Sequence, residues 1–234
     1  MKAHFLVALL GPVLLFGCGH ASEQEVGGSV TPSKSIAPGS VTGVYSNVTV
    51  NEADESFGTE LWVRDDSTYV LRETKPVGDG FPVGTIGQWQ LRDGKLITKG
   101  PTVAITWHGA GTGLESAGSD GEGAEKAERV TLARMQGLPL YEIPVMRLHG
   151  RYRFANGSHS FEPDGAGREL PFGVGEMADE MESVFNGRSD QRVDFVCVEV
   201  ECLLTRGTAQ EGATTVEYAI LFQMNSTLPP SECR

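Results

Sequence analysis

Short segments in which apolar and polar residues alternate with a period of two run through most of the chain after residue 43. This alternation is typical of half-buried β-strands, and turn signals separate the segments. In GQWQLRDGKLITKG the pair Asp93-Gly94 predicts a two-residue hairpin that places Leu91 across from Leu96. We therefore expect an all-β chain of mainly antiparallel strands, folded as a barrel or a sandwich.

The last 90 or so residues combine strands with one helix. Asn156-Gly157 predicts a tight turn that lets Phe161 face Tyr152. In EMADEMESVFNG the apolar residues recur on one face of a helix, and we interpret them as core packing and not as a copper-binding box: Met177, Met181, Val184 and Phe185. Strands, one helix, then two long strands are the pattern of a small Greek-key barrel of the OB type.

The N-terminal residues predict an export signal. One cation, Lys2, precedes an apolar run from Phe5 to Phe16, which is too short for a membrane-spanning helix of roughly 20 residues. The run ends in Leu15-Phe16-Gly17-Cys18, which looks like the bacterial lipobox, so we expect residues 1–17 to be removed and Cys18 to carry a diacylglycerol. The alternative is an ordinary secretory signal followed by an accidental cysteine.

Residues 18–40 lack periodicity and are rich in Gly, Ser and Pro, which predicts a flexible tether. The formal net charge of the full sequence is −12, and loss of Lys2 with the signal makes it −13. A chain this acidic does not attract nucleic acid or anionic lipid headgroups, so we expect no nucleic-acid partner.

These motifs resemble those of a known family, the NlpE-type outer-membrane lipoproteins of copper resistance and surface sensing. The first half matches at the strand that begins with Gly43, at TELWVRDDSTYVLRE, and at the strand that begins with Gly87-Gln88-Trp89. The second half matches from Leu148 through the helix to the penultimate Cys233. The resemblance implies a lipocalin-like small β-barrel over residues 41–138 and an OB-fold-like barrel with one helix over residues 145–234.

The resemblance fails at the family's usual Cys-x-x-Cys, which has been proposed to bind copper. This chain has Glu52-Ala53-Asp54-Glu55 at that place. Thiolates select Cu(I), whereas carboxylates suit harder ions, so the copper role does not transfer residue by residue. Glu52, Asp54 and Glu55 are a candidate divalent-ion site if His108 or another ligand lies close, and the alternative is a solvated acidic loop. We expect no other cofactor beyond the lipid on Cys18.

The remaining three cysteines are expected to form one pair and leave one orphan in an oxidising compartment. The family pairs a loop cysteine before the helix with the C-terminal one, but the matching loop here holds Asp164. Cys197 and Cys202 are five residues apart on one predicted strand, so they face opposite sides and cannot bond to each other.

Strand pairing favours one of the two remaining combinations. If the last two strands turn near Gln210, Cys202 lies opposite about Tyr218 and Cys197 opposite about Gln223, so the C-terminal tail emerges beside Cys197. We predict a Cys197–Cys233 disulfide and a buried, free Cys202. The alternative is that all three thiols stay reduced.

The sequence contains no catalytic motif such as His-Glu-x-x-His or Gly-x-Ser-x-Gly, so we expect a protein that is not an enzyme. The resemblance implies an outer-membrane lipoprotein, facing the periplasm or the cell surface, that reports envelope stress or surface contact, or serves copper homeostasis, with an inner-membrane sensor protein as partner. Two alternatives stay open: a small-ligand or metal-binding envelope lipoprotein, and a structural one with no signalling role.

Overall fold

The computed structural model describes residues 35–37, 39–53, 55–76, 79–117, 129–188, 193–208 and 215–233. Ser33–Arg234 forms one compact unit. Strands make up nearly all of the regular structure in the described ranges, and most of their pairings are antiparallel, so the prediction of an all-β chain with one helix is confirmed. None of the helices in these ranges is long and apolar enough to cross a bilayer.

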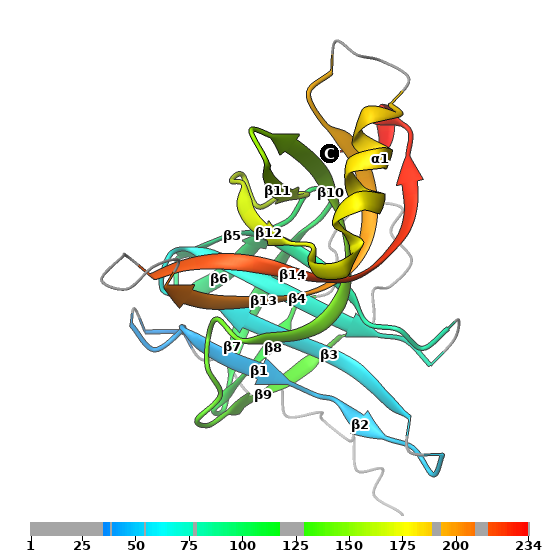
Figure 1. Cartoon of the computed structure of the whole chain (residues 1–234). Helices are drawn as coiled ribbons and strands as arrows, with labels where there is room; N and C mark the ends of the chain where they lie inside the picture. The colour runs from blue at the N-terminus through cyan, green and yellow to red at the C-terminus, as the bar shows by residue number, and fades with distance from the viewer. Residues whose placement is uncertain are drawn as a thin grey trace, which may run out of the picture. The chain divides into compact units, whose positions relative to one another are not determined.

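Eight antiparallel strands of the first half close into a barrel, shown in blue, cyan and green in Figure 1. Their order around the barrel is β5-β4-β3-β1-β9-β8-β7-β6, and the pairing of β6 with β5 closes the ring. A ninth short strand, β2, pairs only with β3. The strand bounds are β1 Gly43–Ser46, β2 Thr49–Val50, β3 Ser56–Val63, β4 Thr68–Thr74, β5 Val83–Arg92, β6 Lys95–Lys99, β7 Ala104–Ala110, β8 Gly113–Ser116 and β9 Thr131–Met135.

Large side chains fill the interior of this barrel. Every second residue of its strands points inward, as the pleat requires. The inward residues form one buried cluster: Tyr45, Leu61, Val63, Tyr69, Leu71, Leu96, Trp107, Leu114 and Leu132. Trp107 is 2% exposed, and its Nε1 donates a hydrogen bond of 3.0 Å to Oγ1 of Thr98, which is itself 1% exposed. The one polar group of this aromatic side chain is therefore satisfied inside the barrel.

The segment just before β1 also belongs to this barrel. Ile36 is only 9% exposed and packs into the interior cluster, and its amide donates a 2.9 Å hydrogen bond to the carbonyl of Gly94. The composition of residues 18–40 predicts a flexible tether, but the packing of Ile36 makes the last residues of that segment part of the folded unit.

Five strands of the second half close into a smaller barrel in the order β10-β11-β12-β14-β13, with β13 paired back to β10. One helix lies beside it, at the top of Figure 1. The bounds are β10 Ile143–Ala155, β11 Ser158–Pro163, β12 Leu170–Gly173, the 3₁₀ helix η1 Gly175–Met177, α1 Ala178–Asn186, β13 Val196–Thr208, β14 Thr215–Leu228 and the 3₁₀ helix η2 Pro230–Glu232.

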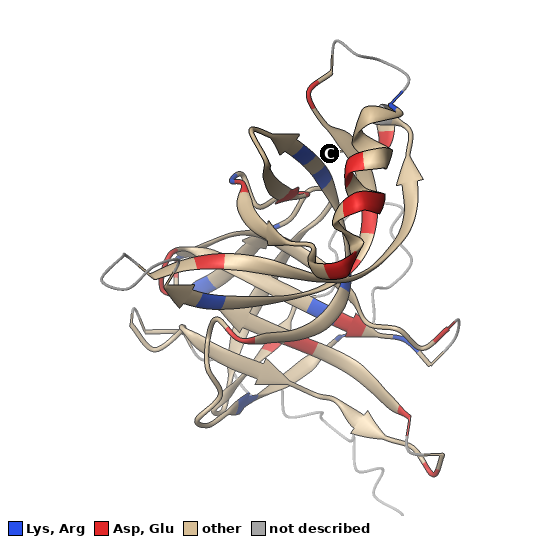
Figure 2. Ribbon diagram, in the orientation of Figure 1, with Lys and Arg blue, Asp and Glu red and all other residues tan. Residues whose placement is uncertain are grey.

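The helix buries the face that its sequence pattern predicts. Met181 and Phe185 are buried in the core of the second barrel, and Met177 packs against that core. Phe185 also meets the ring of Tyr152 edge-on, with ring centroids 6.1 Å apart. These methionine and aromatic side chains serve core packing. Figure 2 shows acidic residues along α1, and Asp179 and Glu180 of its first turn are exposed.

Two hairpins confirm the turns that the sequence predicts. Asp93 and Gly94 both have positive φ, at 51° and 70°, as a type I′ turn requires, and Leu91 lies opposite Leu96. Asn156 and Gly157, at 53° and 75°, form the equivalent turn between β10 and β11. It places Tyr152 opposite Phe161, and both side chains are fully buried.

The predicted register between the last two strands is wrong by several residues. Cys202 lies opposite Leu221, not Tyr218, and Cys197 lies opposite Leu228, not Gln223. The first cause is a longer connection, since the last pair before it is Thr208 with Thr215. The second cause is two β-bulges, at which the register of β14 skips Phe222 and Asn225.

The two barrels share a hydrophobic core. Four residues on the outer face of the first barrel belong to the same buried cluster as the core of the second barrel: Val44, Trp62, Val70 and Ile86. Met146 and Leu148 of β10 face them, and a β-carbon added at Gly84 would meet both side chains within 3 Å. A single parallel pair, Arg147 with Val83, joins β10 to β5 at this seam. The barrels therefore pack directly onto each other.

A buried ionic cluster lies at the same seam. Arg64, which directly follows the first barrel's β3, is 1% exposed, and its Nη2 lies 2.7 Å from Oε1 of Glu217 on β14. Arg168 also forms an ion pair with Glu217 and reaches Asp66 at 3.2 Å. Burial lowers the pKa of Arg64, and the charge of Glu217 opposes that shift. The carboxylate of Glu217 therefore compensates the buried guanidinium, whose loss of hydration would otherwise cost free energy.

Candidate functional site

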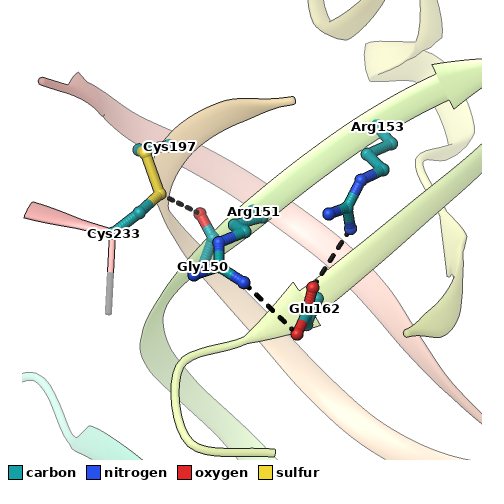
Figure 3. Close-up of a disulfide and its surroundings, with 6 residues drawn as sticks. All are labelled: Gly150, Arg151, Arg153, Glu162, Cys197 and Cys233. Atoms are coloured by element: carbon teal, nitrogen blue, oxygen red, sulfur yellow. Dashed lines mark hydrogen bonds and ion pairs between the residues drawn. A yellow bond between two sulfur atoms is a disulfide. The ribbon is translucent and has the colours of Figure 1, made fainter. Parts of the chain in front are cut away.

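A disulfide ties the C-terminal tail to the wall of the second barrel. It joins Cys197 on β13 to Cys233, 36 residues later, with a Cα–Cα distance of 5.6 Å. Cys197 is 2% exposed, whereas Cys233 lies partly exposed after η2. Figure 3 shows the bond beside Gly150, whose carbonyl oxygen lies 3.9 Å from Cys233 Sγ. The bond therefore joins a residue that is embedded in the sheet to a residue of the tail that is only partly buried.

The strand register explains why these two cysteines meet. Cys197 pairs with Leu228, the last residue of β14, so the chain leaves the sheet directly beside Cys197. Cys202 is a free thiol with no exposed surface, and it lies in the core shared by the two barrels. Burial raises the pKa of the Cys202 thiol to about 12. At neutral pH it is therefore protonated and inert towards thiol exchange.

A ladder of basic side chains runs along the outer face of β10, next to the disulfide. Its members alternate with core residues of the same strand: Arg147, His149, Arg151 and Arg153. Figure 3 shows Arg151 and Arg153 converging on Glu162 of β11, at 3.4 and 3.1 Å. The ladder therefore cross-links β10 to its neighbour through charge-assisted hydrogen bonds.

The other half of the ladder meets carboxylates of β13. His149 Nε2 lies 2.6 Å from Oε2 of Glu199, and Arg147 Nη2 lies 3.0 Å from Oε1 of Glu201. Asn225, one of the two bulged residues of β14, donates to the same two carboxylates. The sequence-based expectations do not include this ladder, although basic residues recur with a period of two in RLHGRYRF.

A pocket of about 540 Å³ lies at the seam between the barrels. It lies among the start of β5, the turn before β7, the middle of β10 and the C-terminal tail. The lining residues are Val83, Gly84, Thr85, Pro101, Thr102, Leu148, His149, Asp164 and Glu232. The volume is within the range of small-ligand sites, and the walls are mainly apolar with a few charged groups.

The candidate metal ligands do not form a cluster in the described part of the chain. Glu52 and Glu55 are exposed in the turn before β3, and Asp54 lies outside the described residues. Glu55 Oε2 accepts a 2.8 Å hydrogen bond from the Asn51 side chain. His108 lies on β7, across from Glu115. Among the described residues no group of three or more metal-binding side chains comes together.

We expect only weak metal binding at this turn. The two described carboxylates are solvated, and oxygen ligands alone hold borderline ions weakly when they are exposed. Isothermal titration of the full-length chain in detergent with Cu(II), Zn(II) and Ca(II) should give dissociation constants no tighter than about millimolar. The control is the chain with Glu52→Gln and Glu55→Gln. Binding in the micromolar range that this double change abolishes would instead establish the metal site.

The predicted lipid attachment residue, Cys18, lies outside the described residues, as do most residues of the expected tether. The structure thus describes the disulfide, its cysteines and two of the three candidate metal ligands.

No protein-family model matches the sequence, and no curated protein matches it. One solved structure that aligns is the Cpx pathway activator NlpE from Escherichia coli, with 17% identity, a TM-score of 0.32, and coverage of 82% of this chain and 97% of the other. A TM-score this low does not establish a shared fold.

Proposed function

We propose that this chain is a lipid-anchored protein of the bacterial envelope that reports the state of the envelope and catalyses no reaction. The observation that carries the proposal is the disulfide between a buried strand and the C-terminal tail, in a chain whose N-terminus reads as a lipobox. The anchor at Cys18 would hold the protein in the outer membrane, and the Cys197–Cys233 bond would be its redox-sensitive part.

The lipid anchor and the disulfide would respond to different conditions in the envelope. Loss of lipidation changes where the protein resides, because acyl chains supply its membrane affinity. Failure of disulfide formation changes its surface, because one end of the tail is then no longer fixed to β13. Either change alters which inner-membrane partner the protein meets. The order of its motifs, which resembles that of NlpE-type lipoproteins, favours this function over a purely structural one.

An envelope-stress reporter in the native bacterium tests the proposal. We expect overproduction of the wild-type chain to raise the reporter, and Cys18→Ala and Cys233→Ser to raise it further or earlier. The matched control is Cys202→Ala, which removes a thiol but leaves both the anchor and the disulfide in place. Radiolabelled palmitate should label the wild-type chain and not the Cys18→Ala chain.

A flat reporter with all variants would contradict the sensing function. The seam pocket would then favour the second candidate, a ligand-binding envelope lipoprotein, because its volume and mixed lining suit a small molecule.

A further inference from the structure

A further cavity, of about 550 Å³, lies against the first barrel, away from the disulfide. It is formed where β3 begins and β4 ends, and the connection from β4 to β5 supplies another of its walls. Charged and apolar side chains both line it. The volume is within the range of sites that take a small ligand.

One wall of this cavity is an ion pair between neighbouring strands. Glu60 on β3 lies directly opposite Arg72 on β4, and Nη1 of Arg72 pairs with Oε2 of Glu60. Leu61 and Leu71, the adjacent residues on these strands, belong to the interior cluster, so the pleat turns the ion pair to the outer face of the barrel. Each of the two charged side chains is 18% exposed, so the pair is partly buried and is held by two paired strands.

The ion pair leaves one donor and one acceptor unused. Within the described ranges, Nη2 of Arg72 and Oε1 of Glu60 form no hydrogen bond. Nε of Arg72 is enclosed by protein, whereas these two atoms are not, so both stay accessible. A guanidinium and a carboxylate side by side thus offer a charged donor next to a charged acceptor, which matches the carboxylate and the ammonium of a zwitterion.

The rest of the lining is apolar or balanced in charge. Phe57 on β3 and Pro82, which directly precedes β5, are partly buried and give the cavity an apolar side. Lys75 and Glu55 are exposed and add one charge of each sign. The lining therefore suits a molecule that carries both charges and an apolar group, and not a pure anion or a pure cation.

The connection between β4 and β5 is fixed by the second barrel. Asp79, which lines the cavity, accepts a 2.8 Å hydrogen bond at Oδ2 from Nη2 of Arg147 on β10. Its Oδ1 accepts a 3.1 Å hydrogen bond from the amide of Phe81, and the guanidinium of Arg147 lies over the ring of Phe81, 5.1 Å from its centroid. These contacts preform the wall, so a ligand does not have to order it.

We propose that this cavity binds a free α-amino acid with a large apolar side chain. Its carboxylate accepts from Nη2 of Arg72 and its ammonium donates to Oε1 of Glu60, because the two charges of an α-amino acid are adjacent, as are those of the ion pair. Its side chain packs on Phe57 and Pro82. A neutral ligand would displace water from both charged groups without replacing the lost hydrogen bonds. The site goes beyond the proposed function and needs neither the lipid nor the disulfide.

Isothermal titration of the full-length chain in detergent with L-phenylalanine and L-leucine tests the site. We expect at least one of them to bind with a dissociation constant below about 1 mM. N-acetyl-L-phenylalanine and L-phenylalaninamide each keep the ring but lose one of the two charges. They should bind at least about tenfold more weakly than L-phenylalanine, because each leaves one member of the ion pair without its ligand partner.

Two variants locate the binding. Glu60→Gln keeps the size of the side chain but removes its charge, and it should weaken binding at least about tenfold. Phe57→Ala leaves the ion pair intact and should weaken binding of L-phenylalanine at least about threefold. The matched control is Glu115→Gln, which removes the carboxylate of another ion pair of the first barrel, that with Arg129, and should bind as the wild type does. Circular dichroism shows whether each variant is folded, and if Glu60→Gln is not, Phe57→Ala decides.

The absence of any heat of binding up to about 10 mM of either amino acid would overturn the proposal. Equal affinity for the two blocked analogues would overturn the assignment of a zwitterion. Unchanged affinity in both folded variants, or an equal loss in Glu115→Gln, would show that the amino acid binds elsewhere.

Discussion

Replacing Glu217 with alanine is expected to lower the free energy of unfolding by about 3–5 kcal/mol, because it leaves a buried cation without its counter-charge. The side chains of Arg64 and Glu217 are 1% and 4% exposed, and their charged atoms are 2.7 Å apart. Removal of the carboxylate leaves the guanidinium of Arg64 buried beside the ring of Tyr141 at 5.1 Å, without its ion-pair partner. A guanidinium does not escape this cost by losing its proton.

Two further variants separate the effect of the buried charges from the effect of the volume that the two side chains fill. The double change Arg64→Met and Glu217→Leu should stay within about 1–2 kcal/mol of the wild type, since a well-packed apolar pair often replaces a buried ion pair without loss. Arg92→Ala removes an exposed pair with Asp93 and should change stability by less than about 0.5 kcal/mol. Urea denaturation followed by circular dichroism measures all three. A cost below about 1 kcal/mol for Glu217→Ala would show that water or Asp66 compensates Arg64.

The position of this ion pair explains why the expected effect is large. Arg64 directly follows β3 of the first barrel, and Glu217 is the third residue of β14 of the second, so the pair joins the two barrels at their seam. Arg168 and Asp66 extend the network across the same boundary. Burial raises the pKa of Asp66, but hydrogen bonds from Thr68 and the charge of Arg168 outweigh it, so the net pKa is lowered. Asp66 therefore supports the fold above its unfolded pKa, and this support is lost as the pH falls through its folded value.

The local features of the fold could be predicted from the sequence because they depend on adjacent residues. Asp93-Gly94 and Asn156-Gly157 fix their hairpins, since a type I′ turn needs positive φ at two consecutive positions. The helix followed from the spacing of Met181 and Phe185. In each case one short stretch of sequence contains the whole signal.

Features that depend on distant residues could not be predicted in this way. The bulges at Phe222 and Asn225 shift the register of β14, and no turn or periodicity marks them in the sequence. Asn225 is placed by its bulge against Glu199 and Glu201, which lie on another strand. Arg64 reads as an ordinary polar residue at the end of a strand, and only the fold brings Glu217 to it.

For the candidate site, the sequence supplied the cysteines but not their surroundings. Cys202 is predicted to be buried and free, and its side chain has no exposed surface. The pocket beside the tail is formed by β5, β10 and Glu232, which are far apart in the sequence, so it has no sequence signature.

Replacing Trp107 with alanine is the second change with a large expected effect, about 3–5 kcal/mol, because it removes the largest side chain from the interior of the first barrel. Trp107 belongs to the inward cluster together with Leu61, Leu96 and Leu114, which are at most 2% exposed. A rigid barrel cannot collapse around the gap, so the loss includes a cavity as well as the transfer term. The loss of the hydrogen bond to Thr98 adds to it.

Trp107→Phe separates these contributions, since it keeps most of the volume and loses only the Nε1 donor. It should cost about 1–2 kcal/mol, measured by urea denaturation with circular dichroism so that the lost fluorophore does not matter.

Indole added to Trp107→Ala should raise its Tm, because an apolar cavity in a barrel binds a ligand that fits it. The wild-type chain should not respond. If Trp107→Ala costs less than about 1 kcal/mol, or if indole stabilises the wild type, the barrel already contains usable space. A ligand-binding function for the first barrel would then regain support, because a barrel of eight strands can hold one small molecule only where side chains leave it room.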